Sequence, residues 1–189
     1  MRTPILALEF TAYWSVAAGD AFVSLEARHI LGAMAMGIGA TLLMDLWNGF
    51  LKRAFGIPSL DYCLLGRWLR HMPAGTLTHA DISAAPPKPR ECTVGWLAHY
   101  TIGVVFALVF VRLASGDWLE RPTALPAVLY GVATVVFPFF VMQPSLGFGI
   151  AGARTRDPTR ARVKSLATHT VFGIGLYACG LVLSWVPLG

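Results

Sequence analysis

The second long apolar stretch of the chain reads VGWLAHYTIGVVFALVFVRLAS, from residue 94 to residue 115. It has His99 near one end and Arg112 near the other, and nearly all of its remaining side chains are aliphatic, aromatic or small. In an α-helix, about 20 such residues cross the ~30 Å hydrocarbon core of a lipid bilayer. We therefore expect this stretch to form a membrane-spanning helix.

Three further stretches have the same character, at approximately 30–50, 123–146 and 165–187. Of the 189 residues of the chain, 56% are hydrophobic and 13% are charged, which is more apolar than an ordinary soluble domain. The four stretches also lack the polar outer stripe that the helices of a soluble bundle carry. The sequence therefore predicts an all-α membrane protein, with a four-transmembrane-helix bundle formed by residues 30–189.

Lys and Arg side chains gather in two of the loops between the predicted spans. The loop at residues 51–93 holds Lys52, Arg53, Arg67, Arg70, Lys88 and Arg90, and the loop at residues 147–164 holds Arg154, Arg156, Arg160, Arg162 and Lys164. The connection between the second and third spans has only Arg112 and Arg121. Because Lys and Arg are retained on the cytoplasmic side, both basic loops are predicted to be cytoplasmic. This topology accounts for the net charge of +5 without a nucleic-acid partner.

Within the first basic loop, apolar residues recur at helical spacing. The apolar set is Leu60, Leu64, Leu65, Trp68, Leu69 and Met72, and the polar set between them is Asp61, Arg67, Arg70 and His71. Ser59 is suited to cap the start of such a helix, and Pro73 is suited to end it. We expect a short amphipathic interfacial helix here, followed by a Pro-rich connector at residues 84–90.

Residues 1–29 are predicted to form an N-terminal extension. Their apolar part, residues 5–18, contains Glu9 and is too short to span a bilayer. Three interpretations are open: an interfacial helix, a signal sequence, or a leader upstream of an internal start at Met34 or Met36. The segment matches a signal-peptidase cleavage site only loosely, which argues against a signal sequence. The interfacial helix or the leader is therefore favoured.

The three cysteines, Cys63, Cys92 and Cys179, form neither a CxxC pair nor a spacing typical of metal ligands. The sequence therefore predicts neither a thiol redox relay nor a zinc site. Since Cys63 and Cys92 fall in the loop that is predicted to face the reducing cytoplasm, we expect them to be free thiols.

Each predicted span carries one strongly polar residue at about the same membrane depth, and these residues are Asp45, His99, Gln143 and His169. At about 1.5 Å per helical residue, each lies roughly 4–8 Å inside the cytoplasmic interface, so we expect the four side chains to converge in a buried polar cluster. A titratable group in hydrocarbon is costly unless it is paired or hydrated, which makes this cluster the candidate functional site. The residues placed to support it are Thr41, Asn48 and Tyr100 on the spans, and Arg67 and His71 in the first loop.

Several functions are compatible with such a cluster. A carboxylate and two imidazoles suit a proton- or ion-coupled membrane component, and a homodimer or larger membrane complex is then expected because four spans are few for a carrier. Alternatively, His99 and His169 bind a metal or haem in a redox subunit. The cluster could also only join the helices of a structural or accessory subunit, or bind a lipid or quinone head group.

Motifs of soluble-enzyme chemistry do not accompany the cluster. The sequence has no nucleophile elbow, no phosphate-binding glycine loop and no zinc-protease helix. It therefore favours a protein that is not an enzyme and has no cofactor, with haem or a metal as the alternative. The lipid bilayer is the partner that the sequence indicates.

A series of short motifs completes the description of the chain. In order they are GIGAT at residues 37–41, MDLW at 44–47, PSLDY at 58–62, GRWL at 66–69, HMP at 71–73, GW at 95–96, HY at 99–100, PF at 138–139, MQP at 142–144, and SL at 165–166 with His169. Together, from about Gly37 to the end, they resemble a bacterial family of small integral-membrane proteins known as domain of unknown function 2938. Residues 1–33 would precede the usual start of that family. The resemblance implies a bacterial inner-membrane protein, and no activity, cofactor or substrate comes with it.

Overall fold

The computed structural model describes residues 5–114 and 118–185, with side chains from His29 onward. Every regular element in these ranges is a helix, and four helical segments are long and apolar enough to cross a membrane. These segments are His29–Phe55 within α1 (Ile5–Phe55), all of α3 (Glu91–Leu113), Ala124–Ser145, and all of α6 (Pro158–Trp185). The predicted all-α architecture with four spans is confirmed.

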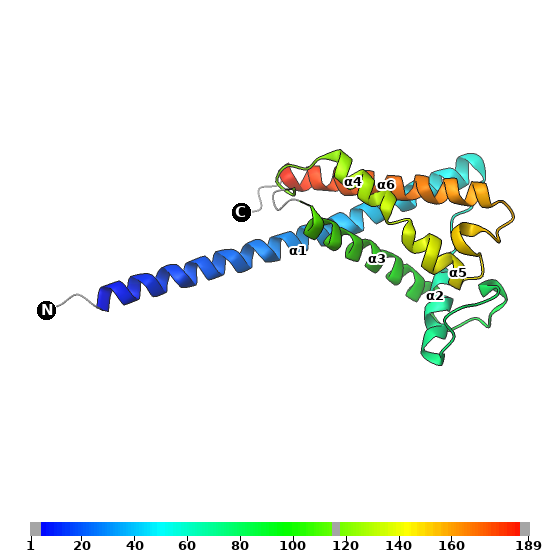
Figure 1. Cartoon of the computed structure of the whole chain (residues 1–189), viewed down its shortest axis with the longest axis horizontal. Coiled ribbons are helices and arrows are strands. Elements are labelled where there is room, and N and C mark those ends of the chain that lie inside the picture. Colours follow the sequence, from blue (N-terminus) through cyan, green and yellow to red (C-terminus); the bar gives the residue numbers. More distant parts are fainter. Residues whose placement is uncertain (1–4, 115–117, 186–189) are drawn as a thin grey trace.

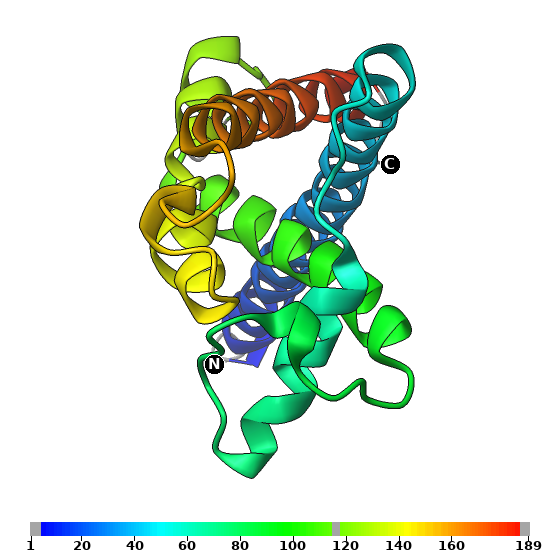
Figure 2. The ribbon, with the colours of Figure 1, turned by 90° about the vertical axis from the view of Figure 1, so that its right-hand side faces the viewer.

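The four spans are arranged around a common centre, as the end-on view in Figure 2 shows. α1 contacts both α3 and α6, and α6 also contacts α4 (Ala124–Ala133). In the side view of Figure 1 the helices lie close together at one end and diverge toward the end that carries α2 (Tyr62–His71). The bundle therefore has a narrow end and a wide end.

Small residues explain why the helices meet closely at one level. A Cβ atom on Gly37 of α1 would lie 2.6 Å from the backbone of α3, and one on Gly175 of α6 would lie 2.7 Å from the Cα atom of Ala40 in α1. Similarly, a Cβ atom on Gly131 of α4 would lie 2.4 Å from the Cα atom of Gly173 in α6. Such residues let helix backbones touch in lipid, where close packing stabilises a helix bundle.

The third span is not one continuous α-helix. α4 ends at Ala133, and the chain passes through a turn into η3 (Pro138–Met142), a π-helical segment, and then α5 (Gln143–Ser145). Pro138 has no N–H to donate to the preceding turn, which accounts for the irregularity. The span ends at Ser145, one residue before the predicted end at residue 146.

The first basic loop contains the expected amphipathic helix, α2. Its N-cap is Asp61, whose carboxylate accepts the Cys63 N–H at 2.9 Å, so the prediction that Ser59 caps the helix is wrong. The helix begins at the residue after Asp61, and Ser59 lies two residues further back, in the connection that follows α1. The apolar face of α2 packs in a small core of its own, made by Leu65, Trp68, Ile82 and Leu146.

A disulfide bond joins α2 to α3. The two helices cross with their backbones in contact, since a Cβ atom on Gly66 would lie 1.7 Å from the carbonyl oxygen of Glu91. This crossing places the Cα atoms of Cys63 and Cys92 3.9 Å apart, and the two sulfur atoms are bonded. The prediction of two free thiols is therefore wrong. It relied on the compartment alone, whereas the pairing follows from a tertiary contact between residues that are 29 positions apart.

The first helix is longer than the predicted first span. α1 begins at Ile5 and continues without a break to Phe55, so residues 5–29 are joined to the span as one helix. Residues 1–4 lie outside the described part of the chain. That the N-terminal segment serves as an interfacial helix or a leader stays a prediction.

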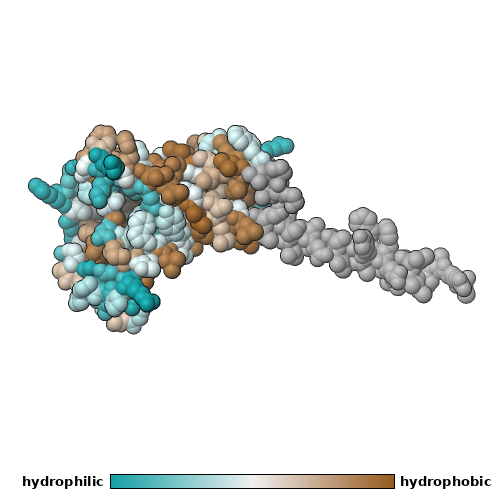
Figure 3. All heavy atoms as spheres, turned by 180° about the vertical axis from the view of Figure 1, so that it is seen from behind, coloured by the Kyte–Doolittle hydropathy of each residue, from teal (hydrophilic) through white to brown (hydrophobic). Residues whose placement is uncertain are grey.

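Large apolar side chains cover the outer surface of the spans. Figure 3 shows hydrophobic residues across the middle of the molecule and hydrophilic residues at the wide end. The exposed residues include Leu31, Leu97, Leu125 and Leu129, each at least 60% exposed. Exposed apolar area of this extent is unfavourable in water and favourable against acyl chains. The fold is that of a multi-pass membrane protein.

The glycine contacts lead to a prediction about stability. Gly131→Ala should lower the free energy of unfolding by about 1–3 kcal/mol, because the new methyl group would overlap the backbone of α6. Gly49→Ala is the matched control, since a Cβ atom on that helical glycine would have nothing within 4 Å. Thermal unfolding in mild detergent compares the two variants. Equal melting temperatures would contradict the packing described here.

Candidate functional site

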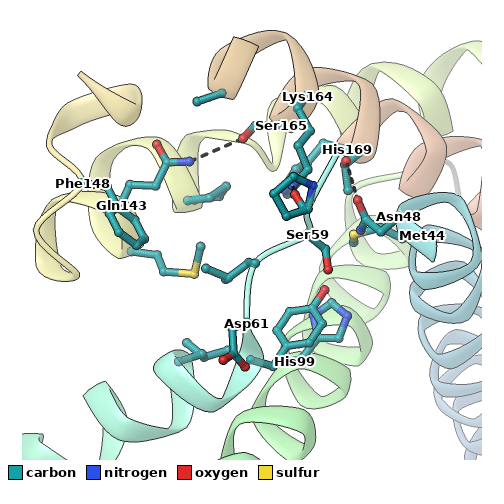
Figure 4. A pocket seen from close by; sticks show the side chains of 18 of the residues that line it. Met44, Asn48, Ser59, Asp61, His99, Gln143, Phe148, Lys164, Ser165 and His169 are labelled. Atoms are coloured by element: carbon teal, nitrogen blue, oxygen red, sulfur yellow. Dashed lines mark hydrogen bonds between the residues drawn. The ribbon is translucent and has the colours of Figure 1, made fainter. Parts of the chain in front are cut away.

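The spans enclose a cavity of about 1160 Å³ at the wide end of the bundle, hereafter the chamber. Its wall includes Met44, Asn48, Ser59, His99, Gln143, Phe148, Lys164, Ser165 and His169, most of which are labelled around it in Figure 4. On α1 the wall begins at Thr41, just past the contact at Ala40, and on α6 it ends at Phe172, just before the contact at Gly173. The chamber is therefore the space that opens where the helices diverge.

Asp45 and His99 form an ion pair or hydrogen bond between α1 and α3. His99 Nε2 lies 3.0 Å from Asp45 Oδ1, and the two side chains are 11% and 16% exposed, respectively. Asp45 Oδ2 is buried and has no hydrogen-bond partner among the described residues. His99 lines the chamber, so the pair lies at its wall, with the imidazole facing the space.

Tyr62 of α2 completes this pair. Its hydroxyl donates to Asp45 Oδ1 at 3.2 Å, and its ring stacks on that of His99 with 4.0 Å between the centroids. Burial of the phenol, together with the neighbouring Asp45 carboxylate, raises the pKa of Tyr62 well above its ordinary value. The hydroxyl therefore keeps its proton at neutral pH and remains a donor to the carboxylate.

His169 and Gln143 line the same chamber but have other partners. Nδ1 of His169 is 2.7 Å from Oγ1 of Thr134, which donates its hydrogen to the carbonyl oxygen of Gly131 at 2.6 Å. Because a hydroxyl has a single hydrogen, it accepts from Nδ1–H, and Nε2 of the neutral ring is left as an acceptor. Gln143 Nε2 donates to Ser165 Oγ at 3.4 Å, while its Oε1 is buried without a partner among the described residues.

The predicted four-residue cluster is thus divided in the structure. A hydrogen bond joins Asp45 to His99, whereas Gln143 and His169 have separate partners on the wall of the same cavity. That the four residues act together as one functional site stays a prediction.

Three of the predicted supporting residues lie at the chamber or next to it. Thr41 lines the chamber and donates to the carbonyl oxygen of Gly37 at 2.7 Å. Asn48 lines it as well and accepts from Thr168 at 3.3 Å. The ring of Tyr100 lies against His99, with 5.5 Å between the centroids. These residues build the wall around the Asp45–His99 pair.

The other two supporting residues belong to the α2 region and not to the chamber. Arg67 pairs with Glu91 at 2.7 Å and donates to carbonyl groups of the connector before α3. His71 Nε2 is 3.0 Å from the carbonyl oxygen of Pro86, and its ring lies 5.1 Å from that of His79. Both therefore fasten the connector to α2.

Residue patterns alone did not identify three important groups. Tyr62 and Thr134 hydrogen bond to Asp45 and His169, and Lys164 donates to the carbonyl oxygen of Pro58 across the opening of the chamber. Tyr62 was part of the PSLDY motif, which was a signal without an assigned role. Lys164 is one of the basic residues that indicate topology, and it directly precedes Ser165 and lies one turn before Thr168 in α6.

A metal site is not evident in the described residues, where no group of three His, Cys, Asp or Glu side chains gathers closely enough to hold an ion. His99 and His169 have hydrogen-bond partners on different helices. That His99 and His169 together bind a metal or haem stays a prediction.

Comparison with known proteins agrees with the resemblance drawn from the motifs. Residues 34–183 match the family described as protein of unknown function (DUF2938). The chain belongs to the DUF2938 family. The matched range includes the chamber wall and most of every spanning segment, so the site of this DUF2938 protein lies within the part that defines the family. Searches of curated proteins and of solved structures give no match.

Double-mutant cycles test whether Asp45 is energetically coupled to His99 and not to His169. We expect Asp45→Asn and His99→Gln to show a coupling free energy of about 1–3 kcal/mol, because each removes the same charge-assisted bond. Asp45→Asn and His169→Gln should be additive within about 0.5 kcal/mol, since their hydrogen bonds are separate. Unfolding of the wild type, the three single variants and the two double variants in mild detergent supplies the free energies for both cycles. Equal coupling in both cycles would show instead that the residues act as one cluster.

Proposed function

We propose that this DUF2938 protein is a proton-coupled component of the bacterial inner membrane. In this proposal the chamber binds a charged solute from the cytoplasmic side, and the Asp45–His99 pair gains or loses a proton as it binds. The observation that carries the proposal is a carboxylate–imidazole pair at the wall of a 1160 Å³ cavity within the spans. A titratable pair in this setting is costly, and such groups commonly mark ion or proton pathways.

The chemistry of the pair is that of a single proton. With both ring nitrogens protonated, the imidazolium and the carboxylate together are neutral. Loss of the Nδ1 proton to water in the chamber leaves Nε2–H donating to Asp45 Oδ1, and the pair then has a charge of −1. Tyr62 donates to the same oxygen in both states, because its raised pKa keeps the phenol neutral. The charge of the chamber wall thus changes by one unit, which alters its affinity for a charged solute.

The surroundings of the protein form part of the proposal. The exposed apolar side chains of the spans are suited to acyl chains of the lipid bilayer. Four spans are few for a complete transport pathway, so we also propose that the protein acts as a homodimer or in a larger membrane complex.

The proton step can be tested by infrared difference spectroscopy on protein reconstituted in lipid. Between about pH 5 and 8, where imidazoles generally titrate, we expect carboxylate difference bands that disappear in both Asp45→Asn, which removes the carboxylate, and His99→Gln, which removes the imidazole that exchanges the proton. Glu120→Gln is the control, since Glu120 is exposed and follows α3 at the opposite end of the bundle. If Asp45→Asn left the bands unchanged, or if none appeared, the pair would serve only to join helices.

Two features bear on the orientation in the membrane. The concentration of Lys and Arg in residues 51–93 and 147–164 supports a cytoplasmic wide end. The disulfide between Cys63 and Cys92 argues for the other side, because such bonds persist in oxidising compartments. The charges act during insertion and are spread over two loops, and they support the cytoplasmic wide end of this proposal.

Thiol labelling decides between the two orientations. In a variant with Thr76→Cys, at an exposed position beyond α2, we expect a membrane-impermeant maleimide to label the protein only after the inner membrane is opened. Thr123→Cys, before α4 at the narrow end, should be labelled in cells whose inner membrane is intact. The reverse pattern would place the disulfide and the chamber opening in the oxidising compartment.

A further inference from the structure

We propose that the ligand of the chamber is an anionic amphiphile: a hydrocarbon chain that carries a carboxylate or phosphate head group. This inference rests on the proposed function, which makes the chamber a binding site, and it adds the chemical class of the solute. The anion would enter from the wide end, with the head group at the opening and the chain inside.

The inner part of the chamber is suited to hydrocarbon. Side chains of Phe106 and Phe137 lie on one side, at 6.2 Å between ring centroids, and Phe172 is 6.3 Å from Phe106. Met44 and Met142 add flexible apolar surface to the same wall. A small hydrated ion would lose its water shell against these side chains at a high free-energy cost, whereas a hydrocarbon chain would gain contacts.

The opening is basic. Arg156, Arg160 and Lys164 line the chamber near the start of α6, and both arginines are exposed to solvent. Lys164 is half-buried and donates to the carbonyl oxygen of Pro58, which accepts one of the three N–H groups of an ammonium. The cations thus lie at the opening, and the apolar side chains lie deeper in the chamber. In this arrangement the cations can bind an anionic head group while the interior holds the hydrocarbon chain.

Carboxylates at the opening do not cancel this charge. Asp157 accepts the backbone N–H of Arg160 at 2.9 Å, and Asp61 accepts the backbone N–H of Cys63 at the same distance. Each is thus engaged at the first turn of a helix, where a negative charge stabilises the helix. The three cations exceed the two carboxylates, and both arginines can turn their guanidinium groups toward a ligand.

A hydroxyl group between the opening and the apolar interior can donate to the same ligand. Ser165 lines the chamber, and its hydroxyl, which accepts from Gln143 Nε2, can donate its own hydrogen to an anion. An anion near His99 would also favour the protonated form of the Asp45–His99 pair. Uptake of the amphiphile would therefore be accompanied by uptake of one proton.

Native mass spectrometry of the purified full-length protein in mild detergent tests this inference. The probes are palmitate and its uncharged methyl ester, and phosphatidylglycerol and zwitterionic phosphatidylcholine. We expect the anionic member of at least one pair to bind about tenfold more tightly than the other member, and this preference to be lost in the double variant R156A/R160A. The double variant R53A/R154A is the matched control, since both of its arginines are exposed and neither lines the chamber.

The results show whether the anion is a free acid or a membrane lipid. They also distinguish failure of this inference from failure of the proposed function. Preference for palmitate identifies a free single-chain acid, and preference for phosphatidylglycerol identifies a membrane lipid. Equal binding of charged and uncharged probes, or an equal loss in the control variant, would overturn the inference. Infrared bands that depend on Asp45 would then still support proton coupling, whereas anion binding without those bands would retain the ligand and refute the coupling.

Discussion

Backbone contact between helices is the constraint on which this structure depends. At each of three crossings a glycine lies so near the neighbouring helix that even a methyl group would overlap it. Lipid does not drive helices together as water does, so close packing and polar contacts must hold the bundle. The contacts are at similar depth on α1, α3, α4 and α6, and beyond them the helices diverge (Figure 1). The chamber and its polar wall are a direct result of that divergence.

The polar residues lie at the level where the helices have diverged, and there their free-energy cost in the bundle is lower. Below the crossings the helices are too far apart to bury one another fully, and a space remains in which imidazole, amide and hydroxyl groups can meet water or each other. Asp45 is at the boundary, with one carboxylate oxygen held by His99 and Tyr62 and the other without a partner among the described residues. An unpaired oxygen on a buried carboxylate carries a free-energy cost, and in a stable protein such a cost is characteristic of functional positions.

Much of the fold could be predicted from the sequence, because bilayer thickness fixes the length of an apolar span and because glycine on a helix face indicates close contact. The depth of Asp45 and His99 followed from the same counting, since each residue advances the helix by a constant rise. Rotation of the helices about their axes could not be obtained in that way. The rotation of α6 places His169 against Thr134 and not against Asp45. This rotation depends on contacts between residues far apart in the chain. The bond between Cys63 and Cys92 and the position of Tyr62 depend on how α2 lies across α3, which has no periodic signal in the sequence.

The glycine crossings have a mechanical consequence. At each crossing a glycine brings two helix backbones into contact, and buried side chains such as Met36, Phe172 and Leu176 pack around that level of the bundle. Each crossing therefore sets the separation of two helices, with the chamber on one side of it and the narrow end on the other. A change in helix separation at one of these contacts would therefore affect both ends of the bundle, the chamber wall on one side and the packing of Trp118 against Gly180 on the other.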